Sequence, residues 1–157
     1  MTSLENEDYL FLRMYSVDLR TASYSMGVLS RTEAADAREC ILRDIVVTYA
    51  RPFSGNRGTT ARSHRLLDLL PDVITEERKT LHEKLMRFRD QLFAHTDLEA
   101  YKPKPVKWER DGHVTFPMTF WGLDYVGLEA QVEELWDLIE TVKATVDEEV
   151  RRLQSSL

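Results

Sequence analysis

The sequence predicts an all-α protein: a four-helix up-and-down bundle with a short extra helical turn after the second helix and a small β-hairpin between the third and fourth. Two observations predict this fold. Apolar residues recur at alternating steps of three and four in four separate segments, which is the spacing of an amphipathic helix. The chain has 157 residues, about the length of one domain, so we expect residues 1–157 to form a single helical domain.

The first two helices are separated by the polar sequence SRTEAAD, in which Ser30 and Thr32 are candidate N-caps. The second helix is expected to stop at Arg51-Pro52, because proline cannot continue a helix interior. The first apolar stripe comprises Leu12, Tyr15, Leu19, Ala22, Met26 and Leu29, and the second comprises Ala34, Ala37, Ile41, Ile45 and Thr48.

The third helix can be capped by Thr75, and the next residue in its step pattern after Leu92 is His95. The fourth helix is expected from about Gly127 to Leu153 and has the longest regular stripe of the chain. The third stripe comprises Leu81, Leu85, Phe88 and Leu92, and the fourth comprises Leu128, Val132, Leu135, Ile139, Val142, Val146, Val150 and Leu153.

The two long connections carry signals of their own. After the second helix, a basic loop is followed by LLDLLPDVI, which predicts the extra helical turn. Between the third and fourth helices, VKWERDGHVTFPM alternates apolar and polar residues around Asp111-Gly112, a pair that favours a tight turn. We therefore expect the small β-hairpin there.

The composition is that of a globular chain with 43% apolar and 31% charged residues, and no apolar run approaches the roughly 18 residues of a membrane span. The N-terminal sequence MTSLENEDYLF is acidic where a secretory signal would be basic, and a single cysteine cannot form an internal disulfide. These features favour a cytoplasmic location. We interpret Cys40 as a small buried hydrophobe, and His64, His82 and His113 as surface or loop residues.

The net charge of −6 conceals a strong division of charge along the chain. Residues 78–110 contain nine basic against five acidic residues, whereas residues 124–150 contain nine acids and one lysine. An acidic run of this kind is often a solvated helix face. Residues 51–65 contain no acid and four arginines: Arg51, Arg57, Arg62 and Arg65.

The stretch RFRDQLFAHTD at the end of the third helix places charged residues among apolar ones. His95 extends the core-facing stripe, and Arg89 belongs to an adjacent apolar strip, where a charge is rarely enclosed unless it is paired. Arg89 and His95 are six residues apart, which is about 240° around an ideal helix. Their side chains would therefore have to converge through a neighbouring helix, a frayed helix end or a second copy of the chain.

This stretch resembles the motif of the HEPN superfamily, in particular of its abortive-infection and toxin branches: an arginine, a small polar or acidic residue, four further residues and a histidine. The matching residues are Arg89-Asp90-Gln91-Leu92-Phe93-Ala94-His95. In that family the motifs of two protomers meet across a dimer interface and form one RNase site without a metal. A second arginine-to-histidine spacing, Arg57 to His64, lies in a Gly/Thr loop and lacks the acidic neighbour. One branch has a tyrosine two residues after the histidine; Asp97 stands there instead.

The resemblance implies a metal-independent endoribonuclease of toxin or abortive-infection type, active as a homodimer, with RNA as substrate and an antitoxin as a possible protein partner. Arg89, Asp90 and His95 would be its catalytic residues, and neither a cofactor nor a metal ion would be needed. We expect the four arginines of residues 51–65 to follow the RNA backbone. The alternative is a non-catalytic helical dimer that binds protein or nucleic acid and uses the same three residues only at its interface.

Overall fold

The computed structural model describes residues 3–57, 63–90, 102–119 and 124–155. Within them the chain is mostly helical. The long helices are α1 (Ser3–Leu29), α2 (Ala35–Ala50), α4 (Glu76–Phe88) and α7 (Val132–Ser155). Short helical segments are the 3-10 turn η1 (Arg51–Phe53), α3 (Leu66–Leu69) and α6 (Tyr125–Glu129). The predictions of a mostly helical chain, of an extra helical turn at Leu66–Leu69 and of a small antiparallel hairpin are confirmed.

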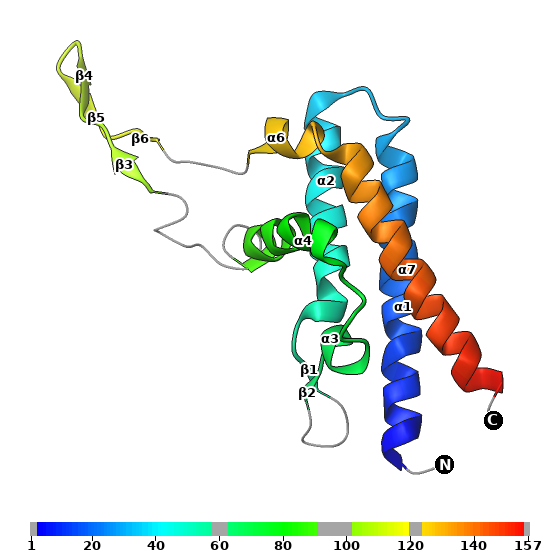
Figure 1. Ribbon diagram of the computed structural model, residues 1–157. Coiled ribbons are helices and arrows are strands. Elements are labelled where there is room, and N and C mark those ends of the chain that lie inside the picture. The colour runs from blue at the N-terminus through cyan, green and yellow to red at the C-terminus, as the bar shows by residue number, and fades with distance from the viewer. Residues whose placement is uncertain (1–2, 58–62, 91–101, 120–123, 156–157) are drawn as a thin grey trace.

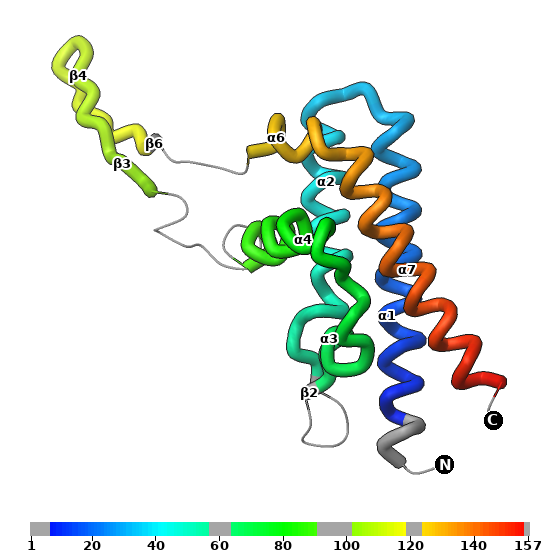
Figure 2. The backbone as a smooth tube through the Cα atoms, in the orientation of Figure 1, coloured from blue at the N-terminus to red at the C-terminus, as the bar shows by residue number. Residues whose placement is uncertain are grey.

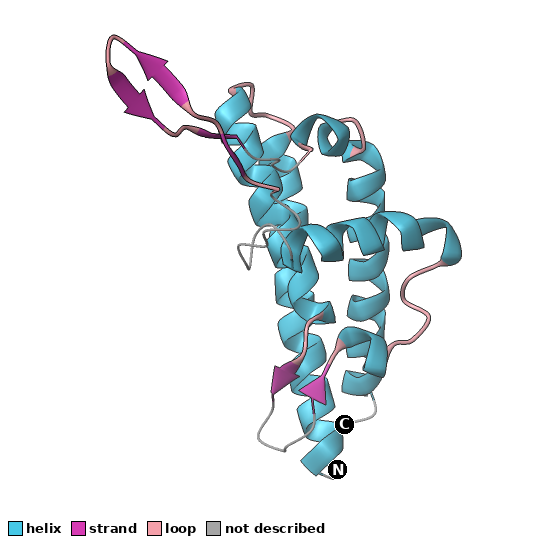
Figure 3. Ribbon diagram, turned by 90° about the vertical axis from the view of Figure 1, so that its left-hand side faces the viewer, coloured by secondary structure: helices cyan, strands magenta, loops and turns pink. Residues whose placement is uncertain are grey.

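Helices α1, α2 and α7 lie side by side, and α4 crosses α2 instead of running along it (Figures 1 and 3). Helix α1 packs against both α2 and α7, while α4 contacts α2 and α7. Polar bonds reinforce the α1–α7 contact, since the Ser16 hydroxyl donates to Asp147 Oδ1 at 2.6 Å and Arg20 pairs with the same carboxylate at 3.2 Å. No helix among the described residues is both long and apolar enough to cross a bilayer.

One apolar core is shared by α1, α2, α4, α6 and α7. All six residues of the first predicted stripe are buried, as are most of the fourth. The second stripe is corrected: Ala34 is exposed outside the helix, and the fully buried α2 residues include Leu42, Val46 and Tyr49 as well as Ile45. The reason is that α2 contacts α1 on one side and α4 on the other, so it buries a wider face than one stripe.

Two other expectations about single elements are wrong. Cys40 is exposed on α2. The last helical segment is divided into α6 and α7, and Asp124 is the N-cap of α6, since its side chain accepts a hydrogen bond from the Gly127 amide at 2.9 Å. This N-cap is the local reason for a separate helical start ahead of Val132.

Two hairpins complete the fold. The first pairs β1 (Asn56–Arg57) with β2 (Ser63–His64) beneath α2. The second, which we call the arm, pairs β3 (Lys104–Pro105) with β6 (Met118–Thr119) and β4 (Trp108–Arg110) with β5 (His113–Thr115). The arm extends away from the helices (Figures 1 and 2).

The two ladders of the arm form one continuous register. Trp108 opposes Thr115 and Pro105 opposes Met118, and between the ladders the Val106 amide donates to the Pro117 carbonyl at 2.9 Å. Pro117 has no amide to return that bond, which is why the ladder is interrupted there. At the tip, Asp111 and Gly112 have φ values of 51° and 76°, the backbone conformation of a type I′ turn. The Asp111-Gly112 turn is thus confirmed.

Substitution of Leu85 by alanine tests the contribution of α4 to the core. Leu85 is fully buried, so its truncation leaves a cavity and should lower the free energy of unfolding by about 2–5 kcal/mol. Leu67, which is 38% exposed on α3, is a matched control and should lose less than about 1 kcal/mol on the same change. The measurement is urea unfolding, and equal losses at the two positions would contradict the burial of α4.

Candidate functional site

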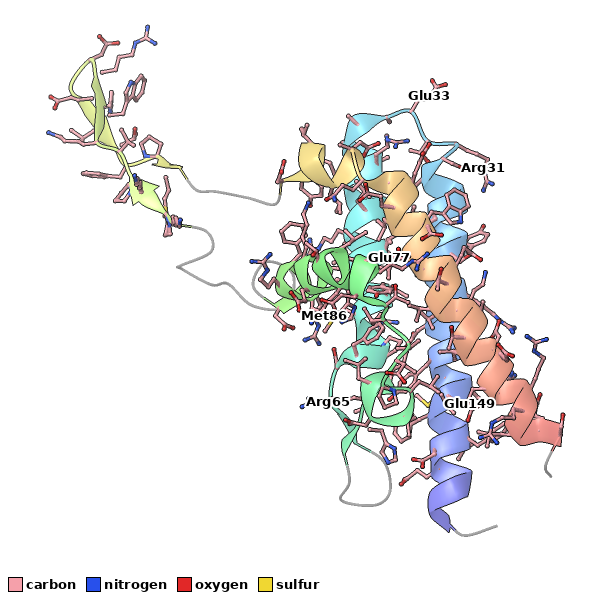
Figure 4. The ribbon with its side chains drawn as sticks, viewed as in Figure 1. Arg31, Glu33, Arg65, Glu77, Met86 and Glu149 are labelled. Atoms are coloured by element: carbon pink, nitrogen blue, oxygen red, sulfur yellow. The ribbon has the colours of Figure 1, made fainter. Side chains whose placement is uncertain are left out.

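Arg89 and Asp90 follow directly after α4, which Leu81 and Leu85 anchor to the core. Helical geometry continues into Arg89, whose backbone has φ −59° and ψ −49° and whose amide donates to the carbonyls of Leu85 and Met86. Met86, which is labelled in Figure 4, lies three residues before Arg89 and marks this end of α4.

The side chains of Arg89 and Asp90 form an ion pair with Nη1 of Arg89 2.6 Å from Oδ1 of Asp90. The arginine side chain is 32% exposed and the aspartate side chain 54% exposed. A pair this accessible contributes at most about 1 kcal/mol to stability. Its main effect is to fix the direction of the guanidinium, whose planar fork suits a phosphate or carboxylate.

His95 lies in residues 91–101, outside the described residues. Its position relative to Arg89 is therefore still a prediction. The described part of the motif consists of an accessible arginine, paired with its neighbouring acid, at the end of a helix that is buried on one face.

The predicted RNA-binding arginines are only partly described. Arg51 lies in η1 and pairs with Asp18 of α1 at 3.3 Å, with 58% of its side chain exposed. Arg65 is exposed next to β2, below Met86 in Figure 4. The backbone of Arg57 lies in β1, whereas the Arg57 side chain and all of Arg62 are outside the described part of the chain. The pairing of β1 with β2 nevertheless brings the two sides of this basic segment together.

His64 is fully buried, which corrects its interpretation as a surface or loop residue. Its Nε2 lies 3.2 Å from Oε2 of Glu7 and its Nδ1 lies 3.2 Å from Oδ1 of Asp8. The ring stacks on Phe11 with 4.1 Å between centroids and 15° between planes. This histidine therefore fastens the β1–β2 hairpin to the first turns of α1. The sequence offered no signal for this contact. Acidic residues such as Glu7 and Asp8 are common near a helix N-terminus because they interact favourably with the helix dipole, so they do not point to a histidine partner.

His82 is also buried, again contrary to the sequence interpretation. Its Nδ1 lies 2.9 Å from the hydroxyl of Tyr49, and its ring meets Phe53 edge-on at 4.5 Å. Burial lowers the pKa of His82 below its ordinary value of 6.5, with Glu83 acting weakly in the opposite direction. Burial also raises the pKa of Tyr49. The pair is thus a neutral hydrogen bond that joins α2 to α4 at the level of the core.

Neither of two surface hollows among the described residues is lined by Arg89 or Asp90. One, of about 430 Å³, lies between α4 and α7 and is acidic. The other, of about 520 Å³, lies between the start of α2 and α6. In the described ranges, no group of three or more histidine, cysteine, aspartate or glutamate side chains could hold a metal ion.

Comparison with known proteins gives no further guide, since no family model, curated protein or solved structure matches the chain.

Replacing His64 by alanine should lower the free energy of unfolding by about 3 kcal/mol, because it removes a buried ring contact and the imidazole that lies 3.2 Å from each of two carboxylates. His113 on the exposed arm is the matched control, and its change to alanine should stay within about 0.5 kcal/mol. Chemical unfolding measures both. A His64→Ala protein as stable as His113→Ala would refute the role of His64 as a fastening residue.

His82 should make stability depend on pH. Its folded pKa lies below the unfolded value of 6.5, so the unfolded chain binds more protons in this range. The contribution of neutral His82 to the free energy of unfolding is complete above about pH 6.5, and it is lost as the pH falls toward the pKa of His82 in the folded protein. Comparing wild type with His82→Gln between pH 7.5 and 5 by thermal unfolding should show a flatter profile for the variant. Parallel profiles would argue against a neutral, buried His82.

Proposed function

We propose that this chain is a metal-independent endoribonuclease of the HEPN type, with an active site assembled from Arg89, Asp90 and His95 of two copies. The observation that carries the proposal is the Arg89–Asp90 pair at the end of α4, in a mostly helical chain with the spacing RDQLFAH. The four-helix HEPN bundle, the dimer and the toxin role belong to the same proposal.

The chemistry needs groups of these types. Cleavage of RNA without a metal requires a base for the 2′-hydroxyl proton, an acid for the leaving 5′-oxygen and positive charge for the transition state. A histidine from each copy would divide the acid and base roles, because imidazole titrates near neutral pH. Arg89 would hold the transferring phosphate, and the products would end in 2′,3′-cyclic phosphate.

The ion pair supports a positioning role for Asp90. Oδ1 of Asp90 lies 2.6 Å from Nη1 of Arg89. This contact holds one end of the guanidinium and so fixes the direction of the planar group. The partial exposure of Arg89 supports access by a substrate phosphate. The positive segment with Arg51 and Arg65 would extend the contact along the RNA backbone, although Asp18 already offsets part of the charge of Arg51.

The same ion pair is also the observation behind the second candidate, a non-catalytic dimer that binds a protein or nucleic acid. In that case Arg89 and Asp90 would only fix an interface, and His95 would have no reaction to perform. The two candidates therefore separate at His95 and not at Arg89.

The test is incubation of wild type and His95→Ala with labelled RNA in EDTA, followed by analysis of the product ends. Wild type should cleave to cyclic-phosphate ends, whereas His95→Ala should lose at least about 100-fold in rate, the usual contribution of a general acid or base. His113→Ala is the matched control and should retain full activity, since His113 lies on the exposed arm. Circular dichroism and solution mass must match wild type for the comparison to be valid.

A folded wild-type protein without cleavage would reject the nuclease and favour the binding dimer. Equal activity of wild type and His95→Ala would instead place any nuclease activity elsewhere in the chain.

A further inference from the structure

Helix α1 has a second apolar stripe that the core does not use. Four of its large apolar side chains are exposed: 54% for Leu10, 60% for Met14, 59% for Val17 and 70% for Tyr24. Exposed Thr21 and half-buried Val28 complete the series, so the steps alternate between four and three. We call Leu10, Met14, Val17, Thr21, Tyr24 and Val28 the α1 seam. Its length is about 27 Å at 1.5 Å per residue.

The seam points away from the rest of the bundle. On a helix of 100° per residue it lies about 150° from the buried stripe of α1. The neighbours of α1 occupy other directions, because Ser16 faces Asp147 of α7 and Ser25 donates to Asp44 of α2 at 3.0 Å. Helix α4 contacts α2 and α7 on the core side. The seam is therefore separate from the Arg89 end of α4.

The seam has the chemistry of a helix interface. Alternating steps of four and three are the spacing of positions a and d in a heptad repeat. Thr21, its polar member, donates its hydroxyl to the Val17 carbonyl at 2.9 Å, which satisfies the hydroxyl within the helix and leaves the methyl group for packing. Because α1 is already held by the bundle, association would require little further ordering of the backbone.

We propose that the α1 seam packs in parallel against the α1 seam of a second copy of this chain. The charges beside the seam favour this occupant and this direction. Arg13 and Asp18 occupy flanking positions g and e, which oppose each other between two chains in parallel register. In an antiparallel pair, Arg13 and Arg20 at position g would face arginines of the other chain.

Asp18 can accept a second cation. Its side chain is 24% exposed and lies 3.3 Å from Arg51, and burial raises its pKa despite that partner. Exposed Arg13 makes no ion pair with any other described residue. In the parallel dimer, Arg13 of each copy approaches Asp18 of the other and places a second positive charge beside this partly buried carboxylate.

The first test compares Val17→Glu with Val126→Glu by light scattering. Val126 is 82% exposed on α6, so the control introduces the same charge at another exposed valine. Val17→Glu should halve the solution mass of wild type, and Val126→Glu should leave it unchanged. A wild-type monomer, or a mass that Val17→Glu does not alter, would overturn the proposal. A wild-type monomer with an intact fold would mean that a different protein covers the seam.

The second test fixes the direction without disturbing the core. In a Cys40→Ser background, Leu10→Cys should form disulfide-linked dimers on mild oxidation, because residues at the same height meet in a parallel pair. Ala144→Cys, exposed on α7, should not. Preferential linkage between Leu10→Cys and a size-tagged Tyr24→Cys chain would demonstrate an antiparallel pair and overturn the stated register. Both tests are independent of RNA cleavage, so loss of the nuclease proposal would leave them unaffected.

Discussion

The burial of one face of α1 is the constraint on which the described structure depends. Its stripe from Leu12 to Leu29 meets both α2 and α7, and the same core receives α4 through Leu81 and Leu85. Near its N-terminus, Glu7, Asp8 and Phe11 also hold His64 and with it the β1–β2 hairpin. Each apolar side chain withdrawn from water contributes roughly 1.5–3 kcal/mol, so this long stripe outweighs any single polar contact in the bundle.

The candidate site depends on α1 only indirectly. Helix α4 does not run along the bundle but crosses α2, where the Tyr49–His82 hydrogen bond and the contact of Phe53 with the same ring join the two helices. This crossing directs the end of α4, with Arg89 and Asp90, beyond the packed helices. The charged pair is thereby kept partly in water, which avoids the large cost of enclosing an arginine.

Sequence periodicity predicted the helices well where a helix has one buried face, as in α1 and α7. It was less accurate for α2, because two neighbours bury adjacent lines of side chains, and for α6, which a turn at Ala130 and Gln131 separates from α7. His64 and His82 could not be predicted, since their partners come from elements distant in sequence. For the motif, sequence supplied the residues, and the structure adds the ion pair and the exposure of Arg89.

The register of the arm has a consequence for strand addition. In an antiparallel ladder, alternate residues direct their amides outward, and Val106 donates inward, so the odd-numbered positions of the first strand face its outer edge. Pro103 and Pro105 occupy two of these positions and cannot donate. Over residues 103–105 that edge therefore offers no amide to an added strand, whereas Lys107 and Glu109 nearer the tip keep outward amides. On the opposite edge the outward amides are those of Val114, Phe116 and Met118. Strand addition along the first strand is therefore limited to the part of the arm near its tip, which shortens the edge open to edge-to-edge aggregation.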